Sequence, residues 1–152
     1  MGVTDFAERF AQKLFTVYPE WRQFAKWRQD SLELDVSVPA PIQKDEKDML
    51  YMIVEMDGEV IVGFDVYHTH FYENFYESED QCFADLFDFV KGLTDETYVV
   101  ATTLREKDGY MLEHWEVLEA SEIEHITCQI LHIRSWNGTY DQDEAGSKNL
   151  KV

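Results

Sequence analysis

The chain has 152 residues, and its 31 acidic and 13 basic side chains give a formal net charge of −18 at pH 7. A hydrophobic content of 45%, with 14% aromatic residues, argues against a disordered chain because this much apolar area can offset chain entropy. A charge of −18 repels other polyanions, so we expect no direct binding to nucleic acid and no binding to a membrane surface.

The length fits one folded unit, and we predict a single α+β domain over residues 1–140 with a polar, frayed tail over 141–152. The N-terminus has neither the basic nor the apolar region of a signal peptide, and no run of apolar residues is long enough for a membrane span. We therefore expect a cytoplasmic protein. Cys82 and Cys128 lie in stretches of apolar periodicity, which predicts that both are reduced and buried.

Two helices are predicted at the start of the chain. Apolar residues recur at helical spacing from Phe6 to Val17, and the Tyr18-Pro19 pair is expected to end this first helix. After Pro19 the spacing of Trp21, Phe24, Ala25 and Arg28 predicts a second, short helix. Both helices are expected to face a core.

The following segment has the alternating pattern of strands. Residues 32–38 alternate apolar and polar side chains, and Pro39-Ala40-Pro41 ends this first strand. Residues 49–56 and 59–67 form two further strands, and the Asp57-Gly58 pair between them is typical of a hairpin turn.

A central helix and three more strands complete the predicted elements. Ser78 and Gln81 have the spacing of a helix cap, and the helix they start is expected to close at Gly92. Residues 97–105 and 110–118 read as a hairpin, and residues 126–134 as a last strand. The order α-α-β-β-β-α-β-β-β predicts the α+β class, with one antiparallel sheet of about five or six strands, N-terminal helices and one central helix.

The negative charge is concentrated in the middle of the chain. Residues 1–30 carry five basic and four acidic side chains, whereas residues 55–96 carry twelve acidic side chains and one basic one, a net charge of −11. Such an excess either solvates exposed faces or forms a surface that attracts a basic partner.

The sequence His68-Thr69-His70 offers two imidazoles on one side of a strand, which is half of a metal site. Together with Ser78 and an acid on an earlier strand, Glu55 or Glu59, it resembles the zinc-dependent JAMM-type isopeptidases. That family has Pro where this chain has Phe71, and a metal-binding Asp where this chain has Gln81. The alternative is a strand end at which one imidazole packs and the other meets a carboxylate such as Glu73.

Other catalytic patterns are missing from the sequence. There is no GxSxG motif, no Walker motif and no GxGxxG motif, and the acids beside Cys82 disfavour a reactive thiolate. We therefore predict a protein that is not an enzyme, with no catalytic residues, no metal ligands and no cofactor.

Two short stretches carry a second resemblance. The segment Tyr67–Phe71 and the segment Arg134–Asp141, in which Asn137-Gly138 predicts a tight turn and Trp136 is expected to cover a sheet edge, resemble parts of small bacterial immunity proteins of polymorphic and contact-dependent toxin systems. The resemblance implies a cytoplasmic inhibitor that binds one cognate toxin domain, often a basic nuclease. An acidic surface independently favours a basic protein partner, because it speeds association.

The predicted partner-binding residues are carboxylates, histidines and aromatic anchors of the central segment, and no oligomeric state is predicted. They are Asp65, His68, His70, Tyr72, Glu73, Phe75, Tyr76, Glu77, Glu79 and Asp80. Two other functions stay open at this point, namely a divergent metal-dependent hydrolase that uses His68 and His70, and an acidic scaffold whose charge serves solubility alone.

Overall fold

The structure is a computed structural model and describes residues 5–143. Helices combine with two antiparallel sheets, which confirms the predicted α+β class. The chain folds into two compact units. Unit 1 contains residues 5–39, 49–63 and 68–88, and unit 2 contains residues 40–48, 64–67 and 89–143.

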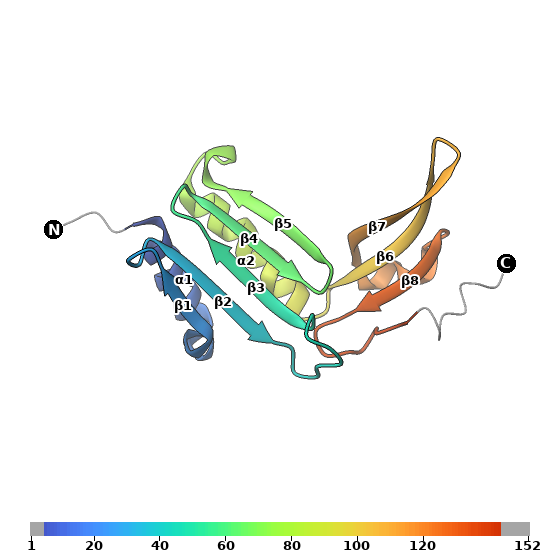
Figure 1. The fold of residues 1–152 in the computed structure, drawn as a ribbon, viewed down its shortest axis with the longest axis horizontal. Helices are drawn as coiled ribbons and strands as arrows, with labels where there is room; N and C mark the ends of the chain where they lie inside the picture. Colours follow the sequence, from blue (N-terminus) through green and yellow to red (C-terminus); the bar gives the residue numbers. More distant parts are fainter. Residues whose placement is uncertain (1–4, 144–152) are drawn as a thin grey trace. The chain divides into compact units, whose positions relative to one another are not determined.

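Unit 1 is built on a five-stranded sheet whose strands lie in chain order (Figure 1). The strands are β1 (Ala25–Arg28), β2 (Glu33–Pro39), β3 (Met49–Val54), β4 (Glu59–Phe64) and β5 (Tyr67–Tyr72). The hairpin expected around Asp57-Gly58 joins β3 to β4, and Gly58 has the positive φ of 92° that such a turn requires. The strand after this turn is shorter than predicted, because the chain turns at Asp65 (φ 54°) and starts β5 at Tyr67.

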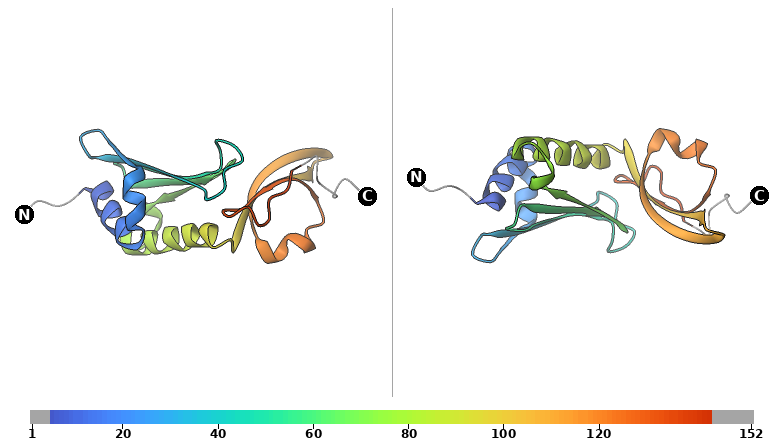
Figure 2. Two further views of the ribbon diagram at one scale, coloured as in Figure 1. Left: turned by 90° about the horizontal axis from the view of Figure 1, so that it is seen from below. Right: turned by 90° about the horizontal axis from the view of Figure 1, so that it is seen from above.

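Two helices cover one face of this sheet, as Figure 2 shows, and both begin and end close to the predicted residues. They are α1 (Phe6–Val17) and α2 (Glu79–Thr94), whose first ten residues belong to unit 1. Phe10 of α1 is fully buried and meets Phe83 of α2 with ring centroids 5.5 Å apart. The Ser78 hydroxyl accepts a hydrogen bond from the Gln81 N–H at 3.1 Å, so Ser78 caps α2 as predicted.

The second predicted helix is wrong. Pro19–Phe24 forms a single 3-10 segment, η1, and the chain then becomes β1, which pairs with β2 so that Trp27 lies opposite Leu34. The turn between β1 and β2 uses three non-glycine residues with positive φ, Gln29, Asp30 and Ser31. Pairing with a distant strand therefore overrides the local helical spacing.

Unit 2 is built on a three-stranded sheet with the order β7-β6-β8. Its strands are β6 (Tyr98–Lys107), β7 (Tyr110–Glu119) and β8 (Gln129–Arg134), and the 3-10 segment η3 (Ala120–His125) joins β7 to β8. The predicted hairpin is confirmed as β6 and β7. The prediction of one sheet for all strands is wrong, because β6 pairs with β7 and β8 and leaves the five earlier strands in a sheet of their own.

The first two residues of the predicted tail, Asp141 and Gln142, form hydrogen bonds within unit 2. Gln142 exchanges backbone hydrogen bonds with Ile133, and Asp141 Oδ1 accepts a hydrogen bond of 2.8 Å from the Ser135 N–H. The tight turn expected at Asn137-Gly138 is confirmed by the 3.0 Å bond from the Gly138 N–H to the Ser135 carbonyl. The rest of the predicted tail lies outside the described residues, and the single domain over 1–140 stays a prediction. Within residues 5–143 no helix has the length and apolar character needed to cross a bilayer.

Both cysteines are free thiols, but their environments differ. Cys82 is buried, as predicted, whereas Cys128 is only half-buried. Burial and then the charges of Glu73, Asp85 and Glu79 raise the pKa of Cys82 to about 11.

This difference predicts selective labelling of the two thiols. At pH 8 only about a thousandth of a thiol with such a pKa is ionised. Ellman's reagent should therefore modify Cys128 readily and Cys82 only on unfolding. Peptide mass spectrometry after short exposure measures the two sites, and fast modification of Cys82 in the folded protein would contradict its placement in the core.

Candidate functional site

Nine of the ten predicted partner-binding residues lie in unit 1, on β5, on the short 3-10 segment η2 (Glu73–Phe75) or around the start of α2. β5 is an edge strand of the five-stranded sheet. Its residues alternate between the helix-covered face, where Phe71 is buried, and the open face, where His68 and His70 are exposed. His68 and His70 thus lie on the same side of β5, as their spacing in the sequence predicted.

Four rings form a continuous row on this open face, which we call the aromatic row (His68, His70, Tyr72 and Phe75). Ring centroids are 5.2 Å apart between His68 and His70, 6.1 Å between His70 and Tyr72, and 5.1 Å between Tyr72 and Phe75. The row ends at Phe75, whose exposed fraction is 80%. An exposed phenyl ring next to a tyrosine is the type of group that anchors protein interfaces.

Glu59 of β4 ties the aromatic row to the rest of the sheet. Its Oε2 atom lies 2.7 Å from His70 Nδ1, and the Tyr72 hydroxyl donates a hydrogen bond to the same side chain. Burial alone would raise the pKa of Glu59, but the hydrogen bonds from Tyr72 and His70 outweigh it and hold that pKa below its ordinary value. Glu59 is therefore a carboxylate at neutral pH that fixes the orientation of two rings.

Glu59 also lines a second feature, which we call the acidic pocket (Glu33, Glu55, Met56, Asp57 and Glu59). It is a hollow of about 270 Å³ in unit 1, at the turn between β3 and β4. Four of its five lining residues are acids. Such a pocket can accept the cationic head of a lysine or arginine side chain.

Two acids of this pocket share a hydrogen bond. Leu34 pairs with Val54, which sets Glu33 beside Glu55, and the hydrogen bond with Glu33 raises the pKa of Glu55, with burial and the charge of Glu33 adding to the effect. Arg28 neutralises only part of this charge, since it pairs with Glu33 at 3.0 Å and also with Asp35 at 2.9 Å. The pocket therefore holds carboxylates that repel one another at neutral pH.

This repulsion predicts that Glu55→Gln stabilises the fold in a pH-dependent way. A pKa raised on folding gives stability that is present below the unfolded value of 4.5 and is lost as pH rises through the folded value. At pH 7 the amide should raise the free energy of unfolding by about 0.5–1 kcal/mol, and at pH 4 it should have no effect. Urea unfolding at both pH values measures the difference. Glu113→Gln, an exposed change on β7, is the control and should leave the free energy of unfolding unchanged at both pH values. If Glu55→Gln instead destabilises the protein at pH 7, Glu33 and Glu55 do not repel each other as described.

Three further predicted residues border the aromatic row. The Glu73 N–H donates a 2.9 Å hydrogen bond to the Gly58 carbonyl, which ties η2 to the hairpin turn beside the acidic pocket. Tyr76 is half-buried and bonds to Asp85, whereas Glu77 is exposed. Glu73 and Glu77 therefore add negative charge to the open edge.

Three predicted residues have other partners. Glu79 forms a two-pronged ion pair with Arg9, with its shortest contact at 2.8 Å, and Asp80 lies 3.2 Å from Lys13. These pairs connect α2 to α1. Asp65 belongs to unit 2, where it is buried with its Oδ2 atom 3.0 Å from His132 Nε2. The structure therefore does not bring Asp65, Glu79 and Asp80 to the aromatic row as free carboxylates.

Among residues 5–143, no third ligand of the usual types lies at metal-binding spacing from His68 and His70. Within residues 5–143, three or more such groups come together at metal-binding spacing at Asp45, Asp48 and Asp65, a set that contains neither histidine. His70 already uses Nδ1 to contact Glu59. The Ser78 hydroxyl, which the JAMM-type resemblance would use, caps α2.

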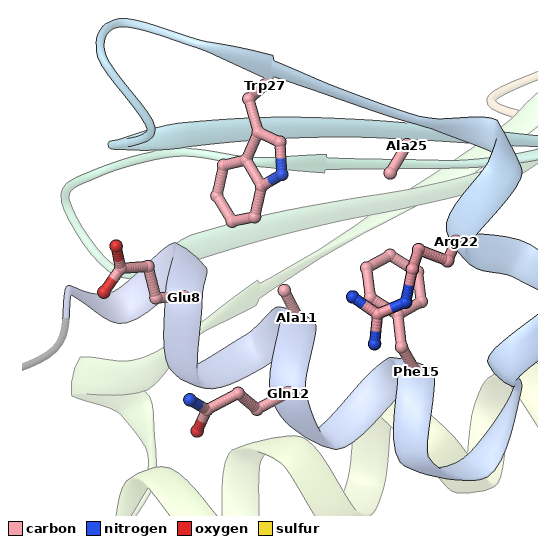
Figure 3. A pocket seen from close by; sticks show the side chains of 7 residues that line it. All are labelled: Glu8, Ala11, Gln12, Phe15, Arg22, Ala25 and Trp27. Carbon is pink, nitrogen blue, oxygen red and sulfur yellow. The ribbon is translucent and has the colours of Figure 1, made fainter.

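A second hollow in unit 1 and an exposed apolar strand in unit 2 are further candidate binding surfaces. Unit 1 has a hollow of about 630 Å³ between β1 and α1. In Figure 3 the indole of Trp27 of β1 lies over the part of α1 that carries Ala11. The one cation of this hollow, Arg22, lies over the Phe15 ring at 4.9 Å. In unit 2 the edge strand β7 exposes Tyr110, Met111, Leu112 and Trp115. Neither surface gathers acidic groups in the way the acidic pocket does.

The sequence did not indicate Glu33 as a site residue. Glu55, Asp57 and Glu59 belong to the acidic segment 55–96 that was expected to attract a basic partner, although none of the three was among the ten predicted partner-binding residues. The excess of acids around the Asp57-Gly58 turn could have indicated the acidic pocket. Glu33 could not be predicted in this way, because it reaches the pocket only through the register of β2 against β3. Comparison with protein families, with curated proteins and with solved structures gives no match for this chain.

Proposed function

We propose that this protein is a non-enzymatic acidic binding protein that acts as an immunity protein in the bacterial cytoplasm. Its partner is a cognate toxin domain with a basic surface, such as a nuclease, which it binds and neutralises. The observation that carries the proposal is the continuity of the acidic pocket with the aromatic row through Glu59.

The two parts of this surface supply different contributions to binding. The carboxylates of the pocket attract a basic protein over distances of about a Debye length and so speed the encounter. Tyr72 and Phe75 offer apolar area that is already ordered by ring contacts, so little entropy is lost when a partner covers them. A basic nuclease provides lysine and arginine side chains that fit the acidic pocket, since its own substrate carries phosphates.

The unfavourable charge of the pocket in the free protein also supports a cationic partner. Glu33 and Glu55 repel each other at neutral pH, and a guanidinium or ammonium group between them removes this repulsion. A carboxyl group in a hollow whose pKa is raised by a neighbouring acid, as that of Glu55 is, is typical of functional sites.

Titration calorimetry tests the proposal with the full chain and the C-terminal domain of any large secreted protein that sequencing finds encoded beside its gene. We expect one-to-one binding that weakens as salt rises from 50 to 300 mM, with loss of the toxin's activity in the complex. Absence of binding to that domain, or a gene neighbourhood without any such domain, overturns the immunity proposal.

Metal analysis separates this proposal from a divergent hydrolase. Protein purified without a histidine tag should contain no stoichiometric zinc. Zinc that is present at one equivalent and lost in His68→Ala would overturn the non-enzymatic proposal, because it would show that the histidine pair ligates a metal.

A further inference from the structure

Unit 2 contains a cluster of three carboxylates that the aromatic row and the acidic pocket do not include. Asp45 and Asp48 lie in the loop between β2 and β3, and Asp65 lies in the turn between β4 and β5. One carboxylate oxygen from each of the three lies within 4.8 Å of the other two. Asp48 and Asp65 are buried, with exposed fractions of 2% and 9%, while Asp45 is exposed.

Each buried aspartate accepts its hydrogen bonds through Oδ2, and Asp48 Oδ1 has a long ionic contact of 3.7 Å with Arg134 Nε. Asp48 Oδ2 accepts hydrogen bonds from the Lys44 N–H at 2.7 Å and the Asp45 N–H at 3.2 Å, and Asp65 Oδ2 lies 3.0 Å from His132 Nε2. The Oδ1 atoms of both aspartates are inaccessible to solvent and accept no hydrogen bond within residues 5–143. A buried carboxylate oxygen without a hydrogen bond is unfavourable, so Asp65 Oδ1 indicates a missing ligand, and so does Asp48 Oδ1, whose one contact is the long one with Arg134.

The nearby cations do not balance the cluster. Lys44 pairs with Asp141 at 3.1 Å, and Arg134 pairs with Asp143 at 2.6 Å while its Nε lies 3.7 Å from Asp48 Oδ1. Each cation is thus shared with an acid outside the cluster. The three clustered carboxylates therefore keep an excess of negative charge.

We propose that Asp45, Asp48 and Asp65 bind one hard divalent cation, Ca²⁺ or Mg²⁺. Carboxylate oxygens are the ligands that both ions prefer, and the exposed side of Asp45 leaves room for the water ligands that complete the shell. Opposite ligands of Ca²⁺ lie about 5 Å apart, so three oxygens within 4.8 Å of one another fit around Ca²⁺ as they stand, whereas Mg²⁺, with opposite ligands about 4 Å apart, requires all three to lie within that shorter distance. His132 acts as a positioning residue because it lies 3.0 Å from Asp65 Oδ2 and so fixes the orientation of this carboxylate, whose Oδ1 atom has no hydrogen bond within residues 5–143.

Calorimetry and thermal unfolding of the full chain test this site, with CaCl₂ and MgCl₂ as separate probes after dialysis against a chelator. The buffer holds 150 mM NaCl to suppress diffuse binding to the net charge of the protein. We expect one saturable site and a higher Tm in the presence of the ion that binds, and the arm with the tighter binding identifies the cation.

Asp45→Asn is the informative variant, because its side chain is exposed and its amide oxygen can still accept the 2.7 Å hydrogen bond from the Lys47 N–H. It should weaken binding by about tenfold or more, and His132→Ala by about tenfold. Asp88→Asn, an equally exposed change on α2, is the matched control and should bind as the unchanged protein does.

Absence of saturable binding up to about 10 mM of either ion overturns the site. Equal weakening by Asp45→Asn and Asp88→Asn also overturns it, because binding would then follow net charge alone. The experiment contains no protein partner, so its failure leaves the immunity proposal untouched.

Discussion

Phe75→Ala should weaken binding of the proposed basic partner by about 10- to 100-fold, which corresponds to about 1–3 kcal/mol. Phe75 is 80% exposed and contacts Tyr72, so its ring offers free apolar area at the end of the aromatic row. Because the ring is outside the core, the variant should keep the Tm of the unchanged protein. Titration calorimetry with the toxin domain measures the affinity, and differential scanning calorimetry measures the Tm.

Trp115→Ala is the matched control for this loss. Trp115 lies on β7 in unit 2 and is also an exposed aromatic side chain, at 59%. Its removal should leave binding unchanged. Unaltered affinity in Phe75→Ala, or an equal loss in Trp115→Ala, would show that the partner does not select the aromatic row.

Gly63→Ala should destabilise unit 1 by about 1–3 kcal/mol. A Cβ atom at Gly63 of β4 would lie 2.1 Å from Cζ and 2.3 Å from the hydroxyl oxygen of Tyr51, whose ring covers this position from β3. The ring must therefore leave its place, and the apolar contact between the two strands is lost. Chemical denaturation of the single variant gives the change in free energy of unfolding.

The double variant Tyr51→Ala/Gly63→Ala isolates the cause. Without the tyrosine ring the added methyl group has space, so the double variant should be more stable than the sum of the two single changes predicts, by about 1 kcal/mol. Additive effects would instead mean that the loss comes from the backbone of β4 and not from the contact with Tyr51.

Elements that depend on neighbouring residues were predicted well. The Asp57-Gly58 turn, the Ser78 cap and the β6–β7 hairpin each need only a short stretch of sequence to form, and each is present. The alternation of His68 and His70 was also predicted, since the period of a strand is local.

Features that depend on distant pairing were missed. The helical spacing of Trp21, Phe24 and Arg28 gave no indication that residues 25–28 pair with β2, and the turn at residues 29–31 contains no glycine or proline to mark it. The chain forms two sheets because β6 pairs with β7 and β8 and not with the earlier strands. Such pairing between distant strands cannot be predicted from a local sequence pattern.

In the candidate site, too, the features that depend on neighbouring residues were predictable and those that depend on distant pairing were not. His68, His70, Tyr72 and Phe75 lie within eight residues, so their common surface follows from one strand and the turn after it. Glu33 reaches Glu55 only through the register of β2 and β3, and Asp65 leaves the surface because the chain turns immediately after β4. The segment 55–96, with its net charge of −11, contains three of the four acids of the acidic pocket, but the charge did not distinguish them from acids that pair with Arg9 or Lys13.

Hydrogen–deuterium exchange of the full chain, free and bound to the toxin domain, tests the central claim most directly. The account predicts slower exchange on binding in peptides that cover residues 55–59 and 67–77, which contain the hairpin turn of the acidic pocket and the aromatic row, with no change in residues 110–119 of β7. Protection confined to β7, or to any segment outside residues 55–59 and 67–77, would contradict it.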